Sequence, residues 1–200
     1  MNILTRLPRT RKSRALTAGV AVAVLGGAAF GGFASAASAS PAASSGTAAP
    51  AVAAPCTTAQ LRVWLGVPGD GSAGHVAYPL EISNVSNHTC TLYGYPGVSA
   101  VGAGGKQLGS AASRDAAVAK RTVTLTPGAT SYSGLLITDT GVYSKSQCDP
   151  VTAIGLRVYP PNTTVYQIID FPFTACAKAG PNFLSVRTVV AGVGIPLHSV

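Results

Sequence analysis

Four cysteines constrain the fold of this chain more strongly than any other feature of its sequence. They are Cys56, Cys90, Cys148 and Cys176. All four follow an N-terminal segment of the type that directs export, and an even number of cysteines in an exported chain indicates disulfides. Because four cysteines allow three pairings, the positions of the turns have to decide between them.

Two turns select the pairing, since partners across an antiparallel hairpin have residue numbers centred on its turn. The first two cysteines are centred on residue 73, inside the glycine-rich turn 71–74. The last two are centred on the Pro-Pro-Asn turn 160–162. We therefore predict the disulfides Cys56–Cys90 and Cys148–Cys176, each worth about 3–4 kcal/mol by loop entropy. A zinc site, the alternative, does not fit because the sequence has no CxxC or CxH pair.

The chain from Cys56 onward shows the period-two alternation of β-strands. Leu61, Val63 and Leu65 alternate with Arg62 and Trp64, which predicts a strand with Trp64 on the opposite face. Further strands are predicted at 76–82, 90–93, 98–101, 123–125, 132–138, 154–158, 165–171 and 184–190, with a short return strand at 106–109. Residues 110–117 are predicted as loop or at most one helical turn, and residues 139–150 as loop. The pattern favours an all-β fold.

The spacing of strands and turns is typical of an antiparallel β-sandwich of immunoglobulin-like or Greek-key type, with seven to nine strands and two disulfides. A partly closed β-barrel has the same strand spacing and is the alternative. Pro79 lacks an N–H, so the strand that contains it is expected at a sheet edge or with a bulge.

The first 55 residues do not read as part of this domain. Residues 6–14 are basic, residues 15–33 are uncharged, and small-residue cleavage sites follow. This layout predicts a Sec-type signal peptide at 1–36 and a secreted or cell-surface protein. Residues 37–55 are an Ala/Ser/Pro tract, predicted as a disordered linker. The domain is expected at 56–190 and a C-terminal tail at 191–200. An uncleaved N-terminal membrane anchor is the alternative.

The net charge of +8 does not indicate a nucleic-acid partner. Five of the fourteen cations lie within residues 6–14, and from residue 37 onward nine Lys and Arg face six Asp and Glu. The domain therefore lacks the basic stripe that nucleic-acid binding requires. Its one adjacent basic pair, Lys120-Arg121, is interpreted as a solvated strand end.

Several motifs together resemble a known family. They are CTTAQL from Cys56, GSAGHVAYPLEISN from Gly71, TCTLYGYPGV from Thr89, LTPGAT from Leu125 and LSVRTV from Leu184. With the signal peptide, the linker and the late cysteine pair, they are similar to the secreted actinobacterial family of domain of unknown function 4232. The resemblance covers about residues 56–190. It implies export and a β-sandwich, and it implies no active site.

No motif for catalysis, metal binding or cofactor binding is present. The three histidines, His75, His88 and His198, match no metal-ligand spacing, and the sequence has no GxSxG or SxxK motif. The acidic residues form no close pair of the kind used in glycoside hydrolysis; they are Asp70, Glu81, Asp115, Asp139, Asp149 and Asp170. No observation argues for a Ser-His-Asp site built in space from Asp70, His75 or His88.

Aromatic side chains are the remaining candidates for a binding surface. Trp64 is interpreted as a core or sheet-packing residue rather than a carbohydrate platform. Tyr93, Tyr95, Tyr159 and Tyr166 are candidates for a sugar- or peptide-binding surface, and tyrosines at strand ends whose hydroxyls reach water are the plainer interpretation.

The sequence therefore predicts an exported, non-catalytic module that binds or scaffolds at the cell envelope or outside the cell. Its expected partner is an envelope or extracellular protein or glycan, with no nucleic acid, no cofactor and no metal. Membrane contact is expected only through an uncleaved N-terminal segment. The first alternative is a secreted hydrolase, which requires a His, a Ser and a carboxylate clustered around a pocket. The second is the same domain displayed on that anchor.

Overall fold

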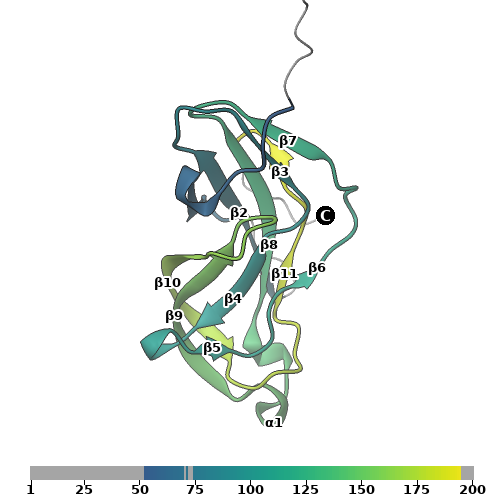
Figure 1. Cartoon of the computed structure of the whole chain (residues 1–200). Helices are drawn as coiled ribbons and strands as arrows, with labels where there is room; N and C mark the ends of the chain where they lie inside the picture. Colours follow the sequence, from purple (N-terminus) through teal and green to yellow (C-terminus); the bar gives the residue numbers. More distant parts are fainter. Residues whose placement is uncertain (1–51, 70, 72–73, 195–200) are drawn as a thin grey trace, which may run out of the picture. The chain divides into compact units, whose positions relative to one another are not determined.

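The computed structural model describes residues 52–69, 71 and 74–194 (Figure 1). The chain divides into two units, Met1–Thr47 and Ala48–Val200, and the described residues belong to the second. The predicted signal peptide, the linker as far as residue 51, and residues 195–200 of the predicted tail lie outside the described residues. So do two of the candidate residues, Asp70 and His198.

The described part of the chain is almost entirely β-structure, in three sheets. The largest sheet has the order β1 (Leu61–Leu65), β2 (His75–Asn84), β8 (Thr130–Thr138), β11 (Leu184–Val186), β6 (Ser113–Arg114), with β12 (Val190–Ala191) also paired to β8. The second has the order β10 (Gln167–Cys176), β9 (Pro150–Tyr159), β4 (Gly97–Val101), β5 (Gln107–Leu108). The third pairs β3 (Cys90–Tyr93) with β7 (Thr122–Leu125).

The predicted all-β, antiparallel class with two disulfides is confirmed. Every strand pair is antiparallel except β11 with β6. The described residues form twelve strands rather than seven to nine, because short strands such as β6 and β12 carry no period-two signal of their own. The immunoglobulin-like or Greek-key connectivity stays a prediction.

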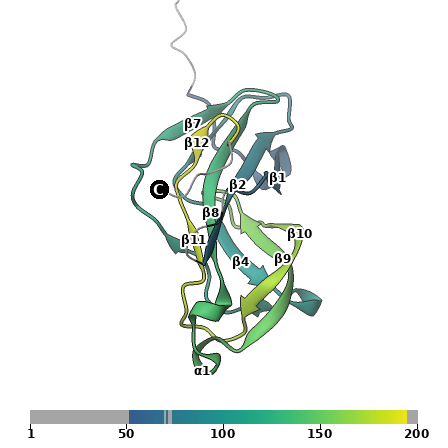
Figure 2. The ribbon, with the colours of Figure 1, turned by 180° about the vertical axis from the view of Figure 1, so that it is seen from behind.

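Buried side chains from all three sheets form one core, most of them aliphatic. Figures 1 and 2 show the strands that carry these side chains from opposite sides. In the longer strands alternate residues point into the core, as period two requires. Leu80 and Ile82 of β2 and Leu135 of β8 enter it from one sheet, and Val98 of β4 and Leu156 of β9 enter it from the other. Aliphatic side chains form most of this core because aromatic residues are few in the sequence.

The edges of the two larger sheets are joined by one side chain, that of Gln167 on β10. Its Oε1 accepts the N–H of Val63 at 3.1 Å, and its Nε2 donates to the carbonyl oxygens of Leu61 at 2.6 Å and Thr58 at 3.2 Å. The amide acts like a peptide group added to the edge of β1. It satisfies backbone groups that an edge strand otherwise leaves to water.

The expectation that Pro79 marks an edge strand or a bulge is wrong. β2 lies between β1 and β8, and its register with β8 is continuous through Pro79. The proline is tolerated because β1 ends at Leu65, and there the N–H of Gly66 donates to the Pro79 carbonyl at 2.8 Å. Only the hydrogen bond that a backbone N–H at position 79 would donate toward β1 is missing, and β1 leaves the sheet at that point.

Three smaller expectations also differ from the structure. Residues 110–117, predicted as loop, contain β6, and residues 184–190, predicted as one strand, divide into β11 and β12. The loop predicted at 139–150 contains η3 (Thr140–Val142) and α1 (Lys145–Cys148). A capping box of Ser144 and Gln147 begins α1, and that signal is independent of hydrophobic period. The other short helices are η1 (Thr58–Gln60) and η2 (Ala103–Gly105).

Both disulfides are present with the predicted partners. Cys56 and Cys90 are bonded with their Cα atoms 4.9 Å apart, and Cys148 and Cys176 with theirs 4.5 Å apart. Each lies at the open end of a hairpin. Cys176 forms the last pair of the β9–β10 ladder, opposite Pro150. Cys56 and Cys90 lie beyond Leu61 and Asn84, the last pair of the β1–β2 ladder.

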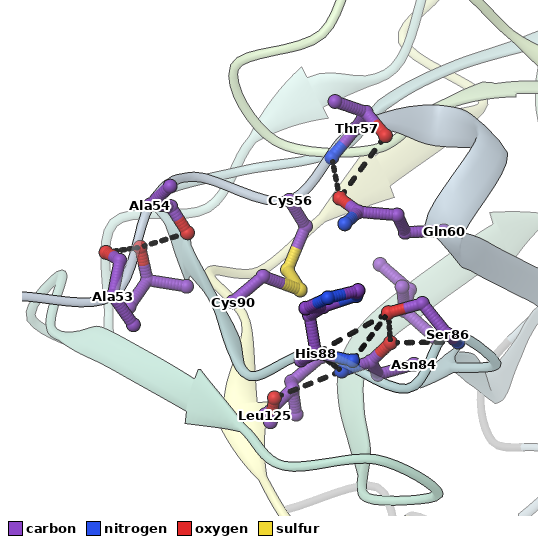
Figure 3. Close-up of a disulfide and its surroundings, with 12 residues drawn as sticks. Ala53, Ala54, Cys56, Thr57, Gln60, Asn84, Ser86, His88, Cys90 and Leu125 are labelled. Carbon is purple, nitrogen blue, oxygen red and sulfur yellow. Dashed lines mark hydrogen bonds between the residues drawn. A yellow bond between two sulfur atoms is a disulfide. The ribbon is translucent and has the colours of Figure 1, made fainter.

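Asn84 connects that hairpin to the small sheet (Figure 3). Its side chain is fully buried, and its Nδ2 donates to the carbonyl oxygens of Leu125 at 2.9 Å and His88 at 2.7 Å. Its Oδ1 accepts the N–H of Ser86 at 3.0 Å and the Ser86 hydroxyl at 2.7 Å. One amide thus shapes the turn before Cys90 and holds the end of β7.

A buried carboxylate lies on the outer face of the largest sheet. Glu81 is 2 % exposed, its Oε1 accepts the N–H of Gly194 at 2.9 Å, and its Oε2 has no partner among the described residues. Burial raises the pKa of Glu81, and the hydrogen bond from Gly194 opposes that shift. A raised pKa means that the fold prefers the neutral form of this side chain.

Replacing Asn84 with alanine is expected to lower the free energy of unfolding by about 2–4 kcal/mol, because two carbonyls and one serine lose their buried partner. Asn87→Ala in the same turn is the control, since Asn87 is exposed, and it should cost less than about 0.5 kcal/mol. Urea unfolding of both variants measures the difference. Equal costs would contradict the role assigned to Asn84.

Replacing Glu81 with glutamine should change the pH dependence of stability. Because the folded protein binds the Glu81 proton more tightly than the unfolded chain does, protonation of Glu81 stabilises the fold. This stabilisation is fully present below the ordinary pKa of 4.5 and is lost as pH rises through the raised pKa of the folded protein. Glu81→Gln should therefore gain stability relative to the wild type as pH rises from 4.5 through the raised folded pKa. Denaturant unfolding across that range measures the change, with the exposed Asp170→Asn as control. A difference that stays constant with pH would contradict the buried-carboxylate account.

Candidate functional site

Three tyrosines from two separate segments line one cavity of about 360 Å³. Tyr93 ends β3, Tyr95 lies in the turn between β3 and β4, and Tyr159 ends β9. The remaining lining residues come from the same turns and from the chain around β6; they are Gly94, Gly97, Arg114, Lys120, Pro160, Asn162 and Thr163. We call this the tyrosine cavity.

Backbone ties hold the Tyr93–Tyr95 turn in place. Gly94 has a φ of +95°, which an L side chain adopts only with strain, so glycine is needed there. The Gly94 carbonyl accepts the buried hydroxyl of Thr188 at 3.0 Å and the N–H of Val189 at 2.9 Å. The turn is therefore anchored to the strand region that follows β11.

The opposite wall of the cavity is anchored to the same turn. Gly97 pairs with Tyr159 across β4 and β9, and a Cβ at Gly97 would lie 3.4 Å from the Cβ of Tyr159. The Nδ2 of Asn162 donates to the carbonyl of Tyr93 at 3.2 Å. These contacts hold Tyr93 and Tyr159 at the ends of paired strands and Tyr95 in the short turn between β3 and β4.

Two cations lie over the tyrosine rings. The guanidinium carbon of Arg114 is 5.6 Å from the centroid of the Tyr95 ring, and the Nζ of Lys120 is 5.8 Å from the centroid of the Tyr93 ring. Both distances are within the range of cation–π attraction. Both basic side chains are exposed, so solvent reaches them from the open side.

The acidic neighbour of Arg114 is engaged elsewhere. Asp115 accepts the N–H of Ala117 at 2.9 Å and pairs with the Nε of Arg187 at 2.9 Å. The Ala117 hydrogen bond, followed by Arg187, lowers the pKa of Asp115. This is the one ion pair within the described residues, so in that part of the chain neither Arg114 nor Lys120 has a carboxylate partner.

The structure brings together three of the four tyrosines that the sequence analysis proposed as a binding surface. Tyr93, Tyr95 and Tyr159 line the cavity, whereas Tyr166 lies outside it, with its ring 5.5 Å from that of Tyr159 and 4.8 Å from the guanidinium carbon of Arg157. Sequence reasoning missed Arg114. No local signal marks it, because its position depends on the pairing of β6 with β11.

Two other sequence interpretations bear on the site. Lys120 and Arg121 are both exposed, as expected of a solvated strand end, and Lys120 also covers Tyr93. Of the interpretation of Trp64 as a core or sheet-packing residue, the core half is wrong. Trp64 lies opposite the core-facing Leu61 and Val63, as predicted, but its side chain is 36 % exposed on edge strand β1.

A second cavity, of about 510 Å³, lies where β2 begins and β8 ends, beside residues 171–174 of β10. Tyr78, Phe171 and Phe173 form an aromatic cluster in it. The ring centroids of Tyr78 and Phe171 are 5.1 Å apart, and those of Phe171 and Phe173 are 5.5 Å apart. His75 also lines it, and its Nδ1 is 2.9 Å from the Oγ1 of Thr138. Asp139 lines it too, but its Oδ1 accepts the N–H of Gly141 at 2.8 Å and caps η3.

The described residues do not assemble a His, a Ser and a carboxylate in either cavity. His75 contacts a threonine hydroxyl and forms no ion pair with Asp139, and His88 is exposed in its turn. Within the same residues, no three His, Cys, Asp or Glu side chains are grouped so as to hold a metal ion. None of the described helices has the length and apolar character needed to cross a membrane.

Comparison with known proteins identifies the family of this chain but no individual related protein. A family model described as "Domain of unknown function (DUF4232)" matches residues 56–190. No curated protein and no solved structure matches the chain. The geometry of the two cavities is therefore the basis on which a function has to be argued.

Proposed function

The chain belongs to the DUF4232 family, and we propose that its domain is a non-catalytic module that binds a ligand outside the cytoplasm, at the cell envelope or beyond it. The observation that carries the proposal is the tyrosine cavity. Three aromatic rings and two cations surround it, and the turn that carries Tyr93 and Tyr95 is held by a buried hydrogen bond from Thr188 and by another hydrogen bond from Asn162.

The proposed location is supported by the disulfides. Bonds such as Cys56–Cys90 and Cys148–Cys176 form and persist in oxidising compartments and are rare in the cytosol. The basic and uncharged segments at the N-terminus have the layout of an export signal. These two features are independent of one another, and both favour export.

The proposed binding role is supported by the character of the cavity walls. Tyrosine offers a large contact area with little loss of conformational entropy, and it carries a hydroxyl for polar ligands. Tyr93 is 45 % exposed although it ends a paired strand, so its ring is available to a partner. Ligand sites commonly combine concavity, aromatic walls and a few fixed polar groups.

The alternative of a secreted hydrolase has weaker support. Its best candidate is His75 beside Thr138 in the larger cavity. The hydroxyl-bearing Thr138 is only 7 % exposed, and the nearby carboxylate of Asp139 is used to cap η3. A nucleophile needs a base that a third group orients, and this pair lacks the third group in the described part of the chain.

A Tyr93→Ala variant is expected to bind insoluble cell-envelope material from the native host at least about tenfold more weakly than the wild type, as loss of a central aromatic contact predicts. Tyr166→Ala is the matched control, because Tyr166 is 46 % exposed and lies outside the cavity. It should bind within about twofold of the wild type. Co-sedimentation of the exported protein gives the affinities, and thermal melting verifies that both variants are folded.

The same assay separates the alternatives. No enrichment of the wild type on envelope material, or equal losses in the two variants, would overturn the binding proposal. Soluble fragments released by the wild type and not by His75→Ala would favour the hydrolase instead.

A further inference from the structure

We propose that the ligand of the tyrosine cavity is an anionic saccharide, whose ring packs on the tyrosines and whose phosphate or carboxylate group binds Arg114 and Lys120. The inference rests on the proposed function and names the ligand class of the same site. It follows from the charge of the cavity, from the chemistry of its walls and from its size.

The charge of the cavity is uncompensated. Arg114 and Lys120 reach it from different segments, β6 and the chain before β7, and none of the acidic residues that the structure describes lines it. Two like charges that face one cavity repel each other, and each gains from an anion placed between them. A concave wall with one sign of charge also concentrates ligands of the opposite sign.

The acid next to Arg114 in sequence is held by partners other than Arg114. Asp115 follows Arg114 directly in sequence, yet its carboxylate is held by Arg187 and by the N–H of Ala117. With Asp115 engaged in this way, Arg114 keeps its guanidinium on the Tyr95 ring and its donors open to solvent. An arginine in that state is suited to the planar, two-point binding of phosphate or carboxylate.

The walls fit a sugar better than a bare ion. Tyr93, Tyr95 and Tyr159 present apolar ring surface next to hydroxyl groups, and sugars likewise combine apolar ring faces with hydroxyls. Asn162 adds an exposed amide at the rim, whose nitrogen already donates to the carbonyl of Tyr93. An inorganic anion would use the two cations and leave these aromatic walls without a contact.

The size of the site argues against a long polyanion as the recognised unit. A volume of about 360 Å³ is at the lower end of the range of small-molecule sites, about 300–1,000 Å³. The domain carries only nine cations against six acids from residue 37 onward, and two of the cations are at this site. The cavity therefore suits one charged sugar, either free or as a unit of a larger glycan.

Titration calorimetry of the exported protein at low ionic strength tests the inference with four probes. Glucose 1-phosphate and glucuronic acid carry ring and charge, glucose carries the ring alone, and inorganic phosphate carries the charge alone. At least one charged sugar should bind about tenfold or more tightly than both glucose and phosphate. The preferred probe identifies phosphate or carboxylate as the group recognised, and added salt should weaken its binding.

Charge variants supply the second readout. Arg114→Ala and Lys120→Ala should each weaken binding of the preferred sugar at least about fivefold, whereas Arg62→Ala, an exposed cation on β1, should leave it within about twofold. Glucose binding as tightly as the charged sugars would overturn the inference. So would phosphate binding as tightly as the sugar phosphate, or no binding of any probe at millimolar concentration.

Failure here is distinguishable from failure of the proposed function. If Tyr93→Ala abolishes envelope binding while the Arg114 and Lys120 variants bind normally, the binding role stands and the anionic class is wrong. If Tyr93→Ala binds the envelope as the wild type does, the tyrosine cavity is not the site, and the inference is overturned with it.

Discussion

The buried amide of Asn84 is the contact on which the arrangement of the sheets depends. At this residue the β1–β2 hairpin ends, and the chain must turn back to begin a different sheet. Such a reversal leaves backbone groups without ladder partners inside the protein, which costs free energy unless another group pairs with them. Asn84 supplies two donors and one acceptor there, and the Cys56–Cys90 disulfide closes the same corner covalently (Figure 3). The position of β3 relative to the largest sheet follows from this pair of constraints.

The position of the tyrosine cavity follows from how Asn84 and the Cys56–Cys90 disulfide fix the start of β3. β3 begins at Cys90 and ends at Tyr93, so fixing its first residue also fixes where its last residue emerges. The turn that follows must reverse within a few residues to start β4 at Gly97, and Gly94 provides the left-handed conformation it needs. Tyr93 and Tyr95 flank that glycine and therefore face the end of β9. A binding surface that is assembled from strand ends in this way is more rigid than one carried on a long loop.

Local patterns predicted those features of the fold that depend on local geometry. The cysteine pairs followed from turn positions because a hairpin relates residues by their distance from one turn, and the strands followed from period two. The environment of Pro79 could not be predicted, since it depends on where the neighbouring β1 ends. The site was predictable only in its tyrosines. Arg114 joins them because the two-residue β6 pairs in parallel with the distant β11, and so short a strand leaves no pattern in the sequence.

The residues that stabilise this domain differ from those at the proposed binding site. Asn84, Gln167 and Thr188 are polar side chains whose hydrogen bonds join one segment to another, and the fold depends on them. By contrast, Arg114, Lys120 and Tyr93 are exposed, and the contacts of Arg114 with Tyr95 and of Lys120 with Tyr93 are of a kind worth at most about 1 kcal/mol at a protein surface. A fold gains little by holding two unpaired cations at one cavity, and their mutual repulsion works against it. Such a cluster is better explained by what it binds than by what it stabilises, and this is the physical reason to place the function of the domain there.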